Sequence, residues 1–215
     1  MKPAGRFGLV TGGARSGKSR FAEKLMRQWM EERKNAGFTG DRIVYVATAQ
    51  ALDEEMAERI RRHREQRPPD WETVEAPMSL FDVLETLAHR TPPPDGVLVD
   101  CATLYWSNRL LAHCGEADAA DGAGSETLDW TAFAQLERQL EEEVDAFGRW
   151  LPGMPYALII VTNEVGWGLV PANALGRAYR DLAGRCNQRL AALAQYVYLV
   201  VAGIPVSIKA PGTDG

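Results

Sequence analysis

Short apolar runs recur along the chain, separated by longer polar or amphipathic stretches. Five runs rich in Val, Ile and Leu cover residues 7–10, 43–47, 97–100, 157–162 and 197–201. Because their apolar residues are continuous rather than alternating, we expect strands buried on both faces, as in a parallel sheet covered by helices. A last run, 205–209, follows a Gly-containing turn and predicts an antiparallel edge strand.

The stretches between these runs have helical periodicity. We expect helices over residues 19–33, 54–64, 79–89, 130–150 and 175–194. A Pro-rich connector at 91–96 and a mobile surface loop at 113–127 complete the chain, with a flexible tail at 211–215. The pattern predicts an α/β fold in one domain over residues 1–210, with a doubly wound, mostly parallel sheet and an antiparallel C-terminal edge strand.

The segment between the first predicted strand and helix carries a phosphate-binding pattern. It has the form G-x-x-x-x-G-K-[ST] and consists of Gly12, Gly13, Ala14, Arg15, Ser16, Gly17, Lys18 and Ser19. In this strand–loop–helix context the pattern is a P-loop, whose backbone N–H groups surround phosphate oxygens. Lys18 then reaches the β- and γ-phosphates, and the Ser19 hydroxyl ligates Mg²⁺. A chance Gly/Ser turn is the alternative, which the flanking strand and helix disfavour.

A second metal-binding group is expected at the end of another buried strand. Asp100 ends the run 97–100, and ligands of open α/β sheets bind outside the carboxyl ends of the strands. Asp100 is therefore a candidate to hold Mg²⁺ with Ser19. The alternative is an Asp that begins a turn or caps a helix, since Thr103 and Asn108 follow.

The predicted helix 54–64 carries a histidine in a basic segment. Asp53 is a candidate N-cap, and Met56, Ala57 and Ile60 mark the expected buried side. His63 lies three residues beyond Ile60. Its neighbours include Arg59, Arg61, Arg62, Arg64 and Arg67. Positive neighbours keep an imidazole neutral and able to attack a phosphate, but a structural histidine on a solvated arginine face fits the composition equally well.

Polar residues also follow the strand 157–162, where Asn163 and Glu164 precede two glycines. Arg177, Arg180, Asp181, Arg185 and Asn187 follow on one helix. These residues favour either a substrate or subunit contact, or a turn and a solvated helix. A guanine-recognising Asn-Lys-x-Asp motif is absent from the sequence, which disfavours a regulatory nucleotide switch.

Composition narrows the function classes. The chain has 215 residues, 46% hydrophobic and 25% charged, with a net charge of −5 and no long basic run, which argues against nucleic acid as a partner. The three cysteines have no C-x-x-C spacing and predict free thiols in a reducing compartment. We find no apolar segment long enough to span a membrane, and therefore expect a soluble cytoplasmic protein.

Taken together, the motifs resemble one enzyme family over nearly the whole chain. Besides residues 10–19, the resemblance rests on residues 45–49, 63–68, 71–75, 98–101, 162–166, 180–181, 184, 187–188 and 203–205. The chain is similar to the bifunctional adenosylcobinamide kinases / adenosylcobinamide-phosphate guanylyltransferases of cobalamin biosynthesis. Some relatives carry paired histidines where this chain has Arg62 and His63, and Glu where it has Asp100. Segments 26–42 and 113–128 look longer than in compact relatives.

The resemblance implies two reactions. ATP or GTP phosphorylates the aminopropanol hydroxyl of adenosylcobinamide, and GMP is then transferred from GTP onto that phosphate through a GMP-histidine intermediate, giving adenosylcobinamide-GDP. The guanylylated histidine falls on His63. Besides the P-loop, the nucleotide contacts fall on Ala47, Thr48, Ala49, Arg64, Glu65, Gln66, Arg67, Glu75 and Asp100. Similar proteins form homotrimers with the nucleotide near a subunit boundary.

Two other functions fit parts of the sequence. A single-activity P-loop kinase would use the same loop with a structural His63, and a nucleotide-binding switch would bind without turnover. Covalent labelling by GMP separates the bifunctional enzyme from both, and phosphoryl transfer to cobinamide separates a kinase from a switch.

Overall fold

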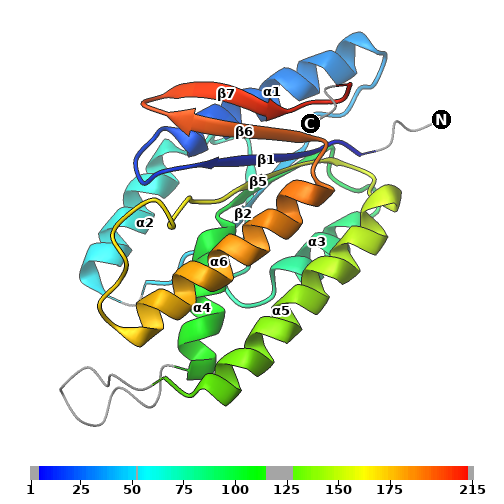
Figure 1. The fold of residues 1–215 in the computed structure, drawn as a ribbon. Helices are drawn as coiled ribbons and strands as arrows, with labels where there is room; N and C mark the ends of the chain where they lie inside the picture. The colour runs from blue at the N-terminus through cyan, green and yellow to red at the C-terminus, as the bar shows by residue number, and fades with distance from the viewer. Residues whose placement is uncertain (1–4, 52, 115–127, 213–215) are drawn as a thin grey trace.

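The computed structural model describes residues 5–51, 53–114 and 128–212, apart from the side chains of Arg59, His63 and Gln66. Within these residues the chain forms a seven-stranded sheet with the strand order β3-β2-β4-β5-β1-β6-β7 (Figure 1). The strands are β1 (Phe7–Gly12), β2 (Ile43–Ala47), β3 (Glu72–Glu75), β4 (Gly96–Asp100), β5 (Ala157–Val161), β6 (Tyr196–Val201) and β7 (Ile204–Lys209). All neighbours pair in parallel except β6 and β7, which confirms the mostly parallel sheet with an antiparallel edge strand.

Helices cover both faces of the sheet. One face packs against α1 (Lys18–Asn35), whose buried residues Ala22, Leu25, Met26, Trp29 and Met30 recur at helical spacing. The other face packs against α3 (Leu80–Ala88), α4 (Ala102–Cys114), α5 (Trp130–Trp150) and α6 (Ala174–Leu193). A 3₁₀ turn, Leu151–Gly153, follows α5. The remaining helix, α2 (Glu54–Gln66), lies at the end of the sheet where β1 finishes (Figure 1).

Two elements were missed by the sequence prediction. Strand β3 reads Glu-Thr-Val-Glu, and only Val74 among its residues is even partly buried, so no apolar run marks this edge strand. Helix α4 buries Thr103 and Asn108 together with Tyr105 and Trp106, so its polar and apolar positions do not separate into two faces. The predicted loop 113–127 is wrong at its start, because His113 and Cys114 end α4; its remainder, 115–127, lies outside the described residues, as does 213–215 of the predicted tail.

Segment 26–42 contains the second half of α1 and the connection to β2, and both are packed into the fold. Residues Met26, Trp29 and Met30 bury the second half of α1 against the sheet. Beyond the helix, the Arg42 amide donates to the Asp95 carboxylate at 3.1 Å, and the Arg42 guanidinium donates to the Pro93 carbonyl at 2.7 Å. These bonds join the end of the segment to the Pro-rich connector, so that β2 and β4 enter the sheet side by side.

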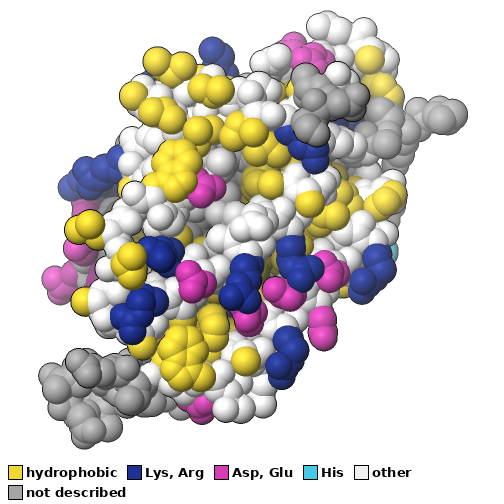
Figure 2. Space-filling model, in the orientation of Figure 1, with side chains coloured by type: hydrophobic (Ala, Val, Ile, Leu, Met, Phe, Trp, Pro, Cys, Tyr) yellow, Lys and Arg dark blue, Asp and Glu magenta, His cyan; other side chains and the backbone are white. Residues whose placement is uncertain are grey.

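The surface differs between two regions (Figure 2). Over α5 and α6, basic and acidic side chains are interleaved, and ion pairs join Arg185 to Glu137 and Arg189 to Glu141. Over the β6–β7 hairpin, hydrophobic side chains gather instead. They include Val201, Ile204, Val206 and Ile208, which are 50–66% exposed. No helix in the described part of the chain has the length and apolar character needed to cross a membrane.

Candidate functional site

The P-loop lies between the end of β1 and the start of α1. Gly17 precedes the helix with φ 93°, in the left-handed region where glycine is favoured. At Gly12, a Cβ would lie 2.4 Å from the carbonyl oxygen of Val200 on β6. Both positions therefore require glycine, because a side chain would strain the loop or push it away from the sheet.

Two hydrogen bonds fix the shape of this loop. Lys18, only 7% exposed, donates from Nζ to the Gly13 carbonyl at 2.5 Å. On the other side, the amide of Gly203 in the β6–β7 turn donates to the Ser16 carbonyl at 2.8 Å. The Ser16 hydroxyl oxygen is buried and has no hydrogen-bond partner among the described residues. The loop thus presents backbone amides, one ammonium group and two hydroxyls in a fixed arrangement.

Asp100 ends β4 beside the P-loop. Its Oδ2 accepts a hydrogen bond of 2.7 Å from the hydroxyl of Tyr45 on β2. The guanidinium of Arg67 stacks over the Tyr45 ring, 4.2 Å from its centroid. Burial and the Asp100 charge raise the pKa of Tyr45, which keeps the phenol protonated as a donor. Burial and the same charge also raise the pKa of Glu23 on α1.

A buried polar network holds the end of β5. The Thr162 hydroxyl donates to Oδ1 of Asn187 at 2.7 Å, and Nδ2 of Asn187 donates to the Asn163 carbonyl at 3.0 Å. The Asn163 amide and side chain both donate to the Thr103 hydroxyl, at 2.6 and 3.2 Å. Thr103, Thr162 and Asn187 are all less than 10% exposed. Buried hydrogen bonds of this kind hold the backbone between β4 and β1 in one conformation.

The next residue, Glu164, connects this network to the P-loop strand. Its amide donates to the Gly12 carbonyl at 3.0 Å, and its Oε1 accepts from the Thr11 hydroxyl at 2.9 Å. Backbone and side chain of Glu164 are therefore both tied to β1. The turn alternative does not account for these bonds of Glu164, and the solvated-helix alternative does not hold for the buried Asn187.

Helix α2 forms the opposite side of the site. The predicted N-cap is confirmed, since Asp53 Oδ1 accepts from the Met56 amide at 2.6 Å. Met56 and Ile60 line the pocket, but Ala57 is exposed, so its predicted burial is wrong. His63 lies one turn beyond Ile60 on this helix.

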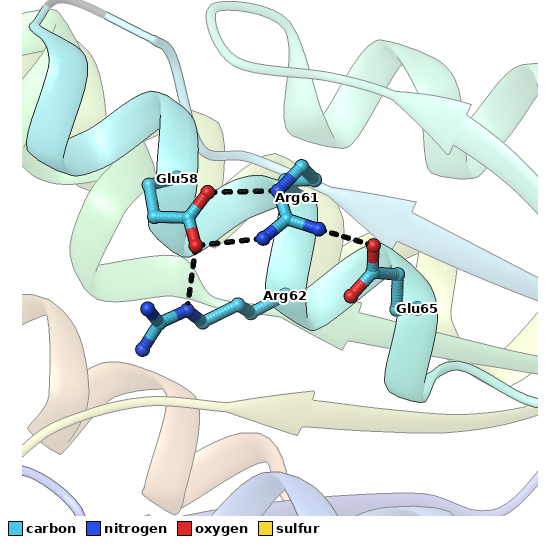
Figure 3. Close-up of polar contacts among 4 residues, drawn as sticks. All are labelled: Glu58, Arg61, Arg62 and Glu65. Atoms are coloured by element: carbon cyan, nitrogen blue, oxygen red, sulfur yellow. Dashed lines mark hydrogen bonds and ion pairs between the residues drawn. The ribbon is translucent and has the colours of Figure 1, made fainter.

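The charged residues of α2 pair mainly with one another (Figure 3). Glu58 accepts hydrogen bonds from Arg61 and Arg62 at 2.7–2.8 Å, and Arg61 also contacts Glu65. Arg61 and Arg62 are 57% and 69% exposed. Hydrogen bonds to Arg61 and Arg62 lower the pKa of Glu58 to about 2. For these two arginines the solvated-face interpretation is correct.

These elements enclose a pocket of about 740 Å³. Nine of the predicted site residues line it: Ala14, Arg15, Ser16, Gly17, Lys18, Ser19, Ala49, Arg67 and Asp100. Four more predicted residues lie in or next to the strands that lead to the pocket: Gly12, Gly13, Ala47 and Thr48. The buried Thr48 hydroxyl donates to the Cys101 carbonyl at 2.7 Å. Arg64 pairs with Glu75 of β3, so these two, with Glu65, are engaged in exposed ion pairs.

Several lining residues were not predicted as nucleotide contacts. They are Arg20, Tyr45, Cys101, Thr103, Leu104, Val161, Val165, Gly168 and Tyr179. Three of them, Cys101, Thr103 and Leu104, lie within four residues of Asp100 at the end of β4. Their position just beyond a strand end could have indicated that they line the pocket. Tyr179 lies in the second turn of α6, and its hydroxyl donates to the Thr103 carbonyl at 3.2 Å, a contact that no sequence spacing indicates.

The fold and this loop define a P-loop α/β protein with a nucleotide-sized pocket at the carboxyl end of the sheet. The family described as "Cobinamide kinase / cobinamide phosphate guanyltransferase" matches residues 8–208, and the chain belongs to this family.

Individual relatives agree with this assignment over nearly their full lengths. The chain is 43% identical over 204 residues to the bifunctional adenosylcobalamin biosynthesis protein CobU of Salmonella typhimurium, a match that covers 94% of this chain and 98% of the relative. It is 40% identical to CobU of Escherichia coli, with the same coverage. It is 37% identical to CobP of Pseudomonas aeruginosa, with 94% and 96% coverage.

Proposed function

We propose that this protein phosphorylates adenosylcobinamide with ATP or GTP, and then transfers GMP from GTP to the resulting phosphate. The observation that carries the proposal is the pocket in which Lys18, Asp100 and Arg67 face a single cavity, in a chain of the cobinamide kinase family. A cavity of about 740 Å³ has the size of a small-molecule site.

The kinase half-reaction uses the sheet side of the pocket. The P-loop amides and the helix α1 N-terminus bind the β- and γ-phosphates, and Lys18 stabilises the charge that develops on the transferred group. Lys18 is buried and hydrogen-bonded to the loop, so it needs little rearrangement to act. Tyr45 orients the Asp100 carboxylate by a 2.7 Å hydrogen bond.

The guanylyl half-reaction uses α2. A neutral nitrogen of His63 attacks the α-phosphorus of GTP, a P–N bond forms, and the P–O bond to pyrophosphate breaks. A phosphate-binding role for Arg67 is supported by its place on the pocket wall and by its buried Nε, which has no hydrogen-bond partner among the described residues.

The donor atoms present suit Mg²⁺. Ser19 and Asp100 both line the pocket and offer hard oxygen ligands, and Mg²⁺ bound with a nucleotide commonly takes one or two protein oxygens besides phosphate and water. Among the described residues, no cluster of three or more His, Cys, Asp and Glu forms a separate metal site. When bound with the triphosphate, Mg²⁺ neutralises phosphate charge.

The acceptor of both groups is the corrinoid, and we expect a homo-oligomer, specifically a trimer. The exposed Val201, Ile204, Val206 and Ile208 of the β6–β7 hairpin support an oligomer, because such apolar clusters commonly mark interfaces. A cytoplasmic location fits three cysteines that are all buried and unpaired.

The experiment that tests the proposal uses GTP labelled at the α-phosphate, with Mg²⁺ and no corrinoid. We expect an acid-labile, base-stable label on the wild type and none on His63→Ala. His63→Ala should still phosphorylate adenosylcobinamide at a rate within a few fold of the wild type. An unlabelled wild type that still phosphorylates cobinamide would leave a single-activity kinase, and a protein that binds GTP without either reaction would leave a nucleotide-binding switch.

A further inference from the structure

The proposed kinase half-reaction still lacks a residue that accepts the proton of the acceptor hydroxyl. The acceptor hydroxyl must lose its proton as its oxygen attacks the γ-phosphorus, and a positioned carboxylate commonly accepts such a proton in kinases. Among the described residues that line the pocket, only two carry carboxylates, Asp100 and Glu164.

Glu164 lines the same pocket as the P-loop and Asp100. It follows the end of β5, the strand that lies between β1, which leads into the P-loop, and β4, which ends in Asp100. The bond from the Glu164 amide to the Gly12 carbonyl fixes its backbone to the first residue of the P-loop. The bond from Thr11 to Oε1 then orients the carboxylate, whose second oxygen can meet a substrate proton. These two bonds hold the carboxylate in a fixed position relative to the phosphate-binding loop.

The other groups on the pocket wall are poorer proton acceptors. Asp100 already accepts from Tyr45 and is the candidate metal ligand. Cys101 is only 5% exposed, and burial raises the pKa of Tyr179, so that the phenol remains protonated near neutrality. The lysine and arginines on this wall are cations with no lone pair to offer.

We propose that Glu164 is the general base of the kinase half-reaction, a role that rests on the proposed function. The hydroxyl proton of the acceptor passes to the Glu164 carboxylate, the hydroxyl oxygen bonds to the γ-phosphorus, and the bond between this phosphorus and the bridging oxygen breaks to release the nucleoside diphosphate. The protonated Glu164 then returns its proton to solvent. The guanylyl half-reaction needs no such base, because its acceptor is already a phosphate anion.

The two half-reactions provide the test. Glu164→Gln keeps an oxygen for the Thr11 bond and nearly the same shape, but it lacks a basic carboxylate. With γ-labelled ATP and adenosylcobinamide, we expect kcat to fall by roughly 10²- to 10⁴-fold with the KM for ATP changed little. With adenosylcobinamide phosphate and GTP supplied instead, GMP transfer should stay within about twofold of the wild type. Glu164→Asp should recover part of the kinase activity, and Glu142→Gln, at an exposed carboxylate on α5, serves as the control.

Each other outcome overturns the proposal. A Glu164→Gln kinase rate near the wild type would show that another group takes the proton, and loss of this activity in His63→Ala would identify that group as His63. Equal losses in both half-reactions and in nucleotide binding would show a structural role. A wild type that forms labelled GMP-protein but never phosphorylates adenosylcobinamide would overturn the proposed kinase function itself, and the role of Glu164 with it.

Discussion

The two sides of the pocket are built differently. On the sheet side, Lys18, Thr162 and Asn187 are each at most 7% exposed, and their polar atoms bond to other parts of the fold. On the α2 side, Arg61 and Arg62 are 57% and 69% exposed, and they bond to acids on the same helix (Figure 3). The first side is held by tertiary contacts, and the second mostly by its own helix.

Because of this difference, we expect the kinase half-reaction to take place on a rigid part of the pocket and the guanylyl half-reaction to depend on a more easily displaced helix. Donors fixed in a buried network stabilise developing charge without reorganisation, which suits phosphoryl transfer at the P-loop. Among the described side chains of α2, Met56 and Ile60 line the pocket and none is buried; Arg67 follows beyond the end of the helix. A helix held by few buried contacts is easily displaced, so we expect the position of α2 to govern guanylyl transfer more than phosphoryl transfer.

The largest expected effect separates two arginines near α2. Arg67→Met removes a cation that faces the pocket, and a charge-assisted hydrogen bond to phosphate contributes about 1.5–3 kcal/mol, so the dissociation constant for GTP should rise roughly 10- to 100-fold. Arg61→Met removes an exposed arginine paired with Glu58 and Glu65, and should change binding by no more than about twofold. Isothermal titration calorimetry measures both. Equal changes in the dissociation constant for the two variants would contradict a direct contact between Arg67 and the nucleotide.

The next effect tests the network behind the sheet side. Asn187→Ala leaves the Thr162 hydroxyl and the Asn163 carbonyl without their partner, which costs about 1–3 kcal/mol of unfolding free energy. For a chain of this size, the melting temperature should fall by about 2–4 °C for each kcal/mol. Gln188→Ala, the exposed neighbour on α6, is the matched control, and differential scanning calorimetry gives the comparison. A melting temperature equal to that of the control would contradict a stabilising network.

The smallest effect concerns Glu58 and pH. Because its pKa is lowered from 4.5 to about 2 by Arg61 and Arg62, its stabilising contribution is present above about pH 4.5 and is lost as the pH falls toward 2. Glu58→Gln should therefore lower the melting temperature slightly, by about 1 °C or less, at pH 7 and at pH 5.5 alike. The gap from the wild type should close between pH 4.5 and pH 2. Thermal melts of both proteins across this pH range measure the difference in melting temperature, with Glu142→Gln as the control for an exposed acid. A difference that grows as the pH falls would contradict the lowered pKa of Glu58.

The sequence predicted the sheet and the P-loop because both have strong local signals. Buried parallel strands are continuous apolar runs, and the loop needs glycine at Gly12 and Gly17 for the geometric reasons seen in the structure. Strand β3 was missed because its sequence, Glu-Thr-Val-Glu, contains no apolar run. Helix α4 was missed because its buried residues include Thr103 and Asn108, whose partners lie on distant segments.

The sequence predicted the site residues that belong to one continuous segment. It did not predict those that depend on contacts between distant segments. Composition could not separate Arg67 from Arg61, because the difference between facing a pocket and facing solvent depends on where α2 ends. The bond between Thr11 and Glu164 joins residues 153 positions apart, and no spacing rule connects them. Such contacts follow from the strand order, which sequence patterns alone do not specify.

The hairpin turn that supports the P-loop has a consequence for how the chain becomes active during synthesis. The Gly203 amide bonds to the Ser16 carbonyl, and Gly203 Cα lies 3.3 Å from where a Cβ on Gly17 would be. The ribosome makes this turn almost 190 residues after the P-loop. The P-loop therefore reaches its final shape only after the turn has emerged, and a nascent chain, or one shortened before this turn, holds the P-loop sequence without the finished binding site.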